Sequence, residues 1–396
     1  MASNNLTIEQ SYAFLNALYE EASGEKSTIQ VTDTGSFTSV AQAVLKTGYD
    51  TIINSISQIL GRTIFSIRPY TAKFKGIDVD SMKWGAIVRK INYIDGEIEE
   101  DDRYNLPENG SVDQYIIKKP KVVQTNFYGS TAYQKHITIF KDQLDVAFSS
   151  AEEFGRFVSG ILQNVSDQLE MIREAEARAT LANFIAGKAV GDTDNYINVL
   201  QEYENETGVT LTPSTMYSDT NYVPFTKWLY SYINTLTEKL AERTIKYHIN
   251  ISGKEIHRHT PANMLKAYMS NRVLNAIDSS VLSSVFNPEK LKMIDWEKVV
   301  YWQNINDPYT VKATPTYLDA TDGTLVTADS AVTVSNIIGV LFDEEALGIT
   351  TQSTWTQATP MNARGGYYNI FYHFTQKLWN DITENGIFLY AAETTC

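Results

Sequence analysis

The chain has 396 residues, of which 43% are hydrophobic and 20% are charged, so it has ample material for an apolar core. Its formal net charge of -14 at pH 7 argues against a dedicated nucleic-acid-binding protein, because such proteins usually carry a clustered basic surface. The single cysteine, Cys396, excludes an intrachain disulfide and a cysteine-based zinc site. Apolar runs such as 337–342 are too short to span a bilayer and no secretory pattern is visible, so we expect no membrane partner and synthesis in a cytoplasm.

Two amphipathic helices are expected at the start of the chain. Apolar residues recur at helical spacing over 7–22, and the polar stretch 24–35 that follows is typical of a linker. A second helix is expected over 37–60, because its apolar residues keep the same spacing and Gly61 stands where a C-terminal cap belongs.

Strand-like segments follow this helical part, with apolar and polar residues in alternation. A turn signal at Gly129 separates two of them. The pattern therefore indicates a region that is built mainly of strands. The expected strands are 63–68, 84–94, 112–119, 122–128 and 132–140.

The long connection between residues 94 and 112 has an unusual charge pattern. Loops above about 12–15 residues are uncommon in compact domains and are often functional. Six of its first eight residues are acidic, a charge density that cannot be buried without partners, and three lysines follow on the returning strand. We therefore expect an outward-projecting β-hairpin arm, although a loop that only adds solubility is the alternative. Its candidates for contacts between subunits are Asp95, Glu97, Glu99, Glu100, Asp101, Asp102, Lys118, Lys119 and Lys121.

Residues 150–187 form the strongest predicted helix. Ser150 and Glu153 have the spacing of a capping box, and apolar residues recur at i, i+3 and i+4 as far as Gly187, which is expected to end the helix. A helix of this length extends about 55 Å at 1.5 Å per residue, several times the usual length. We therefore expect it to act as a spine.

The rest of the chain mixes helices and strands. The polar stretch 189–224 is expected to be an insertion with a short helix near 195–204, and an amphipathic helix is expected over 225–247. Thr260 and Pro261 have the pattern of a helix start, for a helix that reaches about residue 277. A hairpin is expected at Asp322-Gly323, and strands are expected over 332–342, 366–378 and 386–393.

No residue pattern of an enzyme or cofactor site stands out. Glycine-rich phosphate loops, the serine nucleophile elbow and the H-E-x-x-H zinc motif are absent from the sequence. His257 and His259 share one face of an extended segment, and Asp78 and Asp80 form a second pair, but neither pair has further ligands at suitable spacing. The acids 343–345 favour a solvated turn. We therefore expect no catalytic, cofactor-binding or metal-binding residues and no enzyme, with a metal-dependent hydrolase as the alternative of a different class.

The order of these elements resembles the major capsid proteins of tailed bacteriophages, which have the Hong Kong 97-type fold, over essentially the whole chain. The matching segments are the strands and loop of 68–139, the spine helix 150–187, the segment 260–365 and the apolar ending 386–393. The resemblance implies an α+β fold with an N-terminal helical arm, an extended β-hairpin loop, a long spine helix, and peripheral and axial domains. These parts fall at 1–62, 63–149, 150–259 with a helical insertion at 189–247, 260–365, and C-terminal strands at 366–396.

The same resemblance implies a function and partners. Many copies of such a chain form hexamers and pentamers of an icosahedral shell, which encloses double-stranded DNA without sequence-specific binding. The protein is then expected in the virion, after assembly in the cytoplasm of a bacterial host. Because only a short segment precedes the first strand, a separate scaffolding protein is expected, together with a portal. Encapsulin-like protein compartments share the fold, so that alternative stays open.

Overall fold

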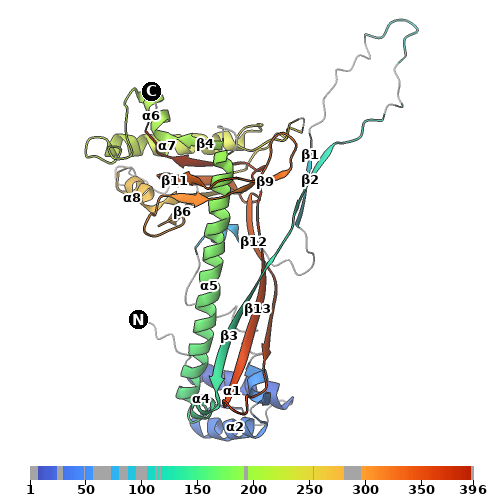
Figure 1. Ribbon diagram of the computed structural model, residues 1–396, viewed down its shortest axis with the longest axis vertical. Coiled ribbons are helices and arrows are strands. Elements are labelled where there is room, and N and C mark those ends of the chain that lie inside the picture. The colour runs from blue at the N-terminus through green and yellow to red at the C-terminus, as the bar shows by residue number, and fades with distance from the viewer. Residues whose placement is uncertain are drawn as a thin grey trace. The chain divides into compact units, whose positions relative to one another are not determined.

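The protein is described by a computed structural model with mixed helices and sheets (Figure 1). Two compact units are each assembled from three separated segments. Unit 1 comprises Met1–Gly85, Gly129–Glu176 and Ile349–Lys377, and unit 2 comprises Ala86–Tyr128, Ala177–Gly348 and Leu378–Cys396. The structure describes residues 8–24, 30–48, 50–56, 73–79, 88–94, 105–111, 115, 117–190, 195–252, 254–280 and 296–393.

The N-terminal helices of unit 1 correct one expectation. Helix α1 (Ile8–Ser23) lies where it was predicted, but the single helix expected over 37–60 is wrong. Helix α2 (Thr34–Lys46) begins early because the Asp33 carboxylate accepts a hydrogen bond from the Ser36 N–H at 2.7 Å. It ends before Gly48, whose φ of 97° is left-handed, and residues 50–56 are helical again. The predicted cap at Gly61 lies outside the described residues.

A three-stranded sheet in the order β12-β13-β3 supports unit 1. Strand β3 (Thr131–Phe140) pairs antiparallel with β13 (Tyr367–Asn380), and β12 (Leu347–Ala358) lies on the other side of β13. Every second residue of β13 from Tyr368 to Phe374 is buried, which confirms the predicted alternation. Tyr368, Ile370 and Tyr372 pack in one apolar cluster with α1, α2 and the start of the long helix. The described residues of unit 1 also include the short helices η1 (Lys75–Ile77) and α4 (Lys141–Ala147).

The long helix α5 (Ala151–Val190) has 40 residues, so its expected length of about 60 Å confirms a helix far longer than average. Its predicted start is confirmed, because the Ser150 hydroxyl accepts a hydrogen bond from the Glu153 N–H at 3.2 Å. Its predicted end at Gly187 is wrong, since the helix continues through this residue. A Cβ at Gly187 would lie 3.4 Å from Cγ2 of Ile382, so this glycine permits close packing rather than a cap.

A five-stranded sheet in the order β4-β14-β11-β5-β6 forms the centre of unit 2. The middle strand β11 is buried at all seven positions and pairs antiparallel with β14 and β5, whereas the edge strands pair in parallel. Buried apolar residues of α6, α7 and α8 belong to the same cluster as those of the sheet. The strands are β4 (Tyr196–Asn198), β5 (Leu265–Ser270), β6 (Trp296–Val299), β11 (Ile337–Asp343) and β14 (Gly386–Tyr390), and the helices are α6 (Val199–Thr207), α7 (Tyr222–Ala241) and α8 (Asn271–Ser280).

Several predicted boundaries in unit 2 are wrong. The helix expected from Thr260 to residue 277 is the strand β5 followed by α8, because β5 is paired on both sides within the sheet and tertiary pairing overrides a local helix pattern. Helix α7 includes Pro224 in its first turn and ends at Ala241, not at residue 247. The helix expected near 195–204 is β4 followed by α6, and the strand expected to reach residue 393 ends at Tyr390.

Two further short antiparallel pairs lie in the described part of unit 2. The hairpin predicted at Asp322-Gly323 is confirmed, and Gly323 has the positive φ of 74° that such a turn needs. The strand expected over 332–342 is divided in two by Asn336, whose φ is 54°. The pairs are β8 (Thr316–Leu318) with β9 (Leu325–Thr327), and β7 (Val311–Ala313) with β10 (Val332–Val334).

Gly348 and Gly160 offer a matched test of packing. In Gly348→Ala the new Cβ would lie 1.9 Å from Cζ2 of Trp379, so we expect a loss of about 1–3 kcal/mol of unfolding free energy. In Gly160→Ala, on the exposed side of α5, the Cβ meets nothing within 4 Å, and a gain of up to about 1 kcal/mol is expected from helix propensity. Urea unfolding followed by circular dichroism measures both values. Equal stability of the two variants would contradict this account.

Candidate functional site: the β1–β2 arm and its anchor

Strands β1 (Val88–Tyr93) and β2 (Val122–Phe127) form the base of the predicted arm, which we call the β1–β2 arm (Figure 1). They pair antiparallel from Val88 opposite Phe127 to Tyr93 opposite Val122, which confirms a β-hairpin at this place. Residues 84–87 of the predicted first strand lie outside the described residues.

The structure describes only some of the predicted charged residues of the arm. All six acidic candidates, from Asp95 to Asp102, lie outside the described residues. Lys118, Lys119 and Lys121 are exposed, and they precede β2 rather than lying on it, so the strand predicted over 112–119 is wrong for residues 117–119. Pro120 explains this, because proline has no N–H for a strand ladder and restricts the residue before it.

The outer face of the arm exposes apolar side chains. Along β1, Ile91 and Tyr93 point to this face with exposed fractions of 52% and 69%, and Val122 opposite Tyr93 is 52% exposed. Tyr115 and Ile117, which precede β2, are each 81% exposed. Exposed apolar residues that gather on one part of a chain are expected where that part binds another molecule. The sequence prediction missed this face, although the alternation within β1 is visible in the sequence.

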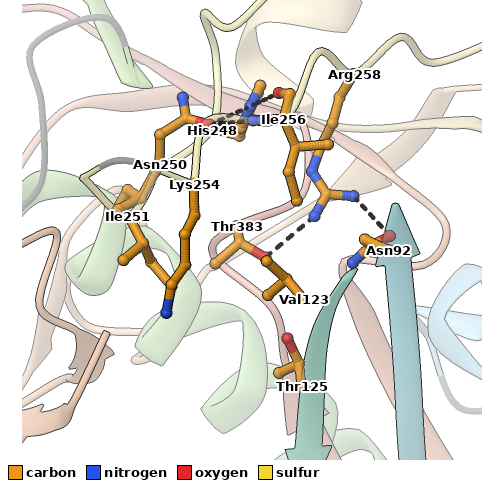
Figure 2. A pocket seen from close by; sticks show the side chains of 11 residues that line it. Asn92, Val123, Thr125, His248, Asn250, Ile251, Lys254, Ile256, Arg258 and Thr383 are labelled. Carbon is orange, nitrogen blue, oxygen red and sulfur yellow. Dashed lines mark hydrogen bonds between the residues drawn. The ribbon is translucent and has the colours of Figure 1, made fainter. Parts of the chain in front are cut away.

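The inner face of the arm carries polar side chains that hold it to the rest of unit 2. Nζ of Lys90 lies 3.1 Å from Oε2 of Glu345 and 3.4 Å from Oδ2 of Asp381, and it also contacts the Glu384 carboxylate. The guanidinium of Arg258 contacts the same carboxylate and donates to Oδ1 of Asn92 at 3.4 Å (Figure 2). Polar side chains of β1 therefore hold the arm against the rest of unit 2.

These contacts converge on the turn between β13 and β14, residues 381–385, which we call the anchor turn. All five of its residues are buried, although only Ile382 is apolar. Oδ1 of Asp381 accepts from the N–H and the hydroxyl of Thr383 at 3.0 and 2.5 Å, which closes the turn locally. Lys188 of α5 is fully buried beneath it and donates to the carbonyl oxygen of Glu384 at 3.0 Å.

The electrostatics of the anchor follow from its burial. Burial raises the pKa of Glu384, against the attraction of Lys90 and Arg258. Burial would lower the pKa of Lys90, but the carboxylates of Asp381 and Glu384 outweigh it and the pKa is raised. Burial lowers the pKa of Lys188 to about 7, because the attraction of Asp381 and Glu384 does not offset the loss of water around its ammonium group. Lys90 is therefore held as a cation by the acids that it meets.

A small cavity of about 20 Å³ lies between the inner face of the arm and the segment 248–258 (Figure 2). Val123 and Thr125 of β2 line it on one side, and Ile251 and Ile256 are among the residues of the segment that line it. Room for about one water molecule remains, so the arm is not closely packed here.

The structure also places three of the four His and Asp residues considered from the sequence. Asp78 accepts from Nε of Arg173 at 2.9 Å, and Asp80 lies outside the described residues. His257 and His259 are exposed on either side of the buried Arg258. Within the described part of the chain, no group of three His, Cys, Asp or Glu side chains could hold a metal ion.

The solvated turn expected at the acids 343–345 is confirmed for Glu344 and Glu345, whose side chains are 42% and 56% exposed in a turn, and is wrong for Asp343. Asp343 ends β11, is buried, and accepts from the Thr260 hydroxyl at 2.8 Å, because the paired strand removes it from water. Glu344 and Glu345 instead meet Lys266 and Lys90. None of the helices in the described ranges has both the length and the apolar character that a membrane crossing requires.

Comparisons with solved structures identify the fold. A chain in the capsid structure of Staphylococcus phage Andhra matches with a TM-score of 0.53 at 10% identity, over 83% of this chain and 86% of that chain. A chain in the structure of the head fiber and inner core protein gp22 of native bacteriophage P68 also gives 0.53, at 11% identity, over 82% and 86%. The fold is therefore one found in phage particles.

A comparison with curated proteins gives no match. The family model of the Phi29-like phage major capsid protein matches residues 15–390, and so includes the arm, α5 and both sheets. Because this match covers nearly the whole chain, the protein belongs to the Phi29-like phage major capsid proteins, and its function is to form the shell of a phage capsid.

Proposed function

We propose that this capsid protein has the Hong Kong 97-type fold and assembles as hexamers and pentamers into an icosahedral shell around the double-stranded DNA of a tailed phage. The observation that carries the proposal is the β1–β2 arm, which exposes apolar side chains that a monomer has no reason to expose. The family match favours neither the encapsulin-like compartment nor the metal-dependent hydrolase.

The proposal assigns the parts of the chain as the resemblance implies. The N-terminal helical arm is 1–62, the extended loop is 63–149, and α5 is the spine of a peripheral domain at 150–259. The axial domain is 260–365, and the C-terminal strands are 366–396. The apolar cluster that α6 and α7 share with the central sheet supports a modification, in which the stretch 189–247 is part of the core and not an added insertion.

The proposed partners follow from the same reading. The chain acts without enzyme activity, is assembled in the cytoplasm of a bacterial host with a separate scaffolding protein and a portal, and encloses DNA without reading its sequence. The net charge of -14 supports this last point, because a strongly DNA-binding wall would hinder packing. The charged part of the arm is proposed to dock on a neighbouring subunit, where charge pairs fix orientation and partner choice.

Reversal of the arm acids tests the docking role. Changing Glu99, Glu100, Asp101 and Asp102 together to Lys is expected to abolish assembly, because attraction to a basic patch on the neighbour becomes repulsion. Circular dichroism of the variant should match the unchanged chain, which is the control for folding. Negative-stain microscopy of the chain expressed with its neighbouring genes counts closed shells. Shells in normal yield would disprove docking through these acids.

The exposed apolar residues that precede β2 give a second test. Tyr115→Ser with Ile117→Ser removes two side chains that are 81% exposed, so the stability of the subunit should change by less than about 0.5 kcal/mol. Assembly should nevertheless require at least tenfold more protein, as measured by light scattering across a concentration series. Ile305→Ser, which removes a 70% exposed apolar side chain outside the arm, is the matched control. An equal effect of both changes would show that the arm has no special part in assembly.

A further inference from the structure

The β1–β2 arm is held against the rest of unit 2 mainly by polar contacts. On its inner face, Lys90 meets three carboxylates and Asn92 meets Arg258, while the cavity of about 20 Å³ leaves Val123 and Thr125 incompletely packed. An element that is held by dispersion contacts resists tilting over its whole area, whereas an element held by a few polar contacts depends on those contacts. The direction of the arm therefore depends on a small number of side chains.

Glu384 occupies the central position among these contacts. Its carboxylate binds both Lys90 and Arg258. Arg258 in turn donates to Asn92, as Figure 2 shows. Lys90 and Asn92 are two residues apart on β1 and share the inner face of the strand. One carboxylate thus controls two successive inner positions of the arm.

The surroundings of Glu384 make this contact hard to replace. Its side chain is 7% exposed, and those of Arg258 and Lys90 are 9% and 16% exposed. Without the Glu384 charge, Arg258 and Lys90 would face each other in a poorly hydrated site. Asp381 would remain beside Lys90, at 3.4 Å, but Arg258 would lose its carboxylate.

We propose that Glu384 is the positioning residue of the β1–β2 arm, and that it sets the direction in which the arm meets a second copy of this chain without touching that copy. The fold itself rests on other contacts, because the core of unit 2 is the apolar cluster of the central sheet and its helices. That Glu384 holds the arm in place is independent of the proposed function. Only the contact of the arm with a second copy of this chain rests on the proposed function.

Hydrogen–deuterium exchange of the purified full-length chain tests whether Glu384 holds β1 and β2 in place. In Glu384→Gln, which keeps the shape and removes the charge, amides of β1 and β2 are expected to exchange at least tenfold faster, while those of β5 and β11 keep their rates. The matched control is Asp278→Asn, which removes an ion pair of 2.8 Å with Lys298 that is about half exposed, and no change is expected there.

A second variant covers the case in which Glu384→Gln fails to fold. Lys90→Met removes the cation that contacts Glu384 from β1, and it should raise the amide exchange rates of β1 and β2 to a similar degree. The double variant should exchange more slowly than the product of the two single effects predicts, because both changes break the Lys90–Glu384 contact. Unchanged exchange of β1 and β2 in both single variants would overturn the proposal, and so would faster exchange of the whole of unit 2.

Assembly of Glu384→Gln separates the two levels of the proposal. A released arm together with a severalfold loss of closed shells supports both the positioning role and the docking role of the arm. A released arm together with normal shells would support the seating by Glu384 but would refute docking by a fixed arm. Normal exchange with a loss of shells would refute the positioning role and leave the docking role intact.

Discussion

The anchor turn is the constraint around which unit 2 is arranged. A polar turn between two strands normally lies in water, but residues 381–385 are buried, so each polar group needs a partner within the protein. Lys188 of α5 donates a hydrogen bond to the carbonyl oxygen of Glu384, and Oδ1 of Asn385 lies 2.9 Å from Nδ1 of His248. The backbone takes part as well, because the N–H of Asp343 donates to the Asn385 carbonyl at 3.0 Å and that of Ile249 donates to the Ile382 carbonyl at 3.2 Å. The long helix, the central sheet and the arm therefore meet at one place.

Such a cluster is a poor means of gaining stability. Desolvation costs several kcal/mol for each buried ion. A protein in which well-packed apolar side chains replace such ions is often equally stable or more stable. What charged contacts provide is direction, since Lys90 and Arg258 must reach one carboxylate in a particular arrangement. A shell subunit needs this property, because the same surface must face a neighbour in every copy. The apolar cluster holds unit 2 together, and the anchor determines where the arm of that unit points.

The sequence predicts those parts of the fold whose local pattern agrees with their final environment. Strand β13 is an example, since its alternation matches one buried face, and the start of α5 is another, since Ser150 caps it. Prediction fails where distant pairing decides, as at β5, whose partners lie on β6 and β11. The anchor was missed for the same reason, because Lys90, Arg258 and Glu384 are far apart in the sequence. A charged residue within a strand-like segment, such as Lys90, is the one local signal that pointed to it.

The discontinuous make-up of unit 1 has a consequence for synthesis on the ribosome. Strand β3 pairs along its length with β13, and the contact between Thr138 and Asn369 spans 231 residues of chain. At about 5–20 residues per second, β3 waits roughly 10–50 seconds for its partner to be made. During this time a long strand with apolar side chains stands without the neighbour that covers it, and contacts so distant in sequence form slowly. Nascent chains of a shell-forming protein would thus be open to mispairing with one another during this interval.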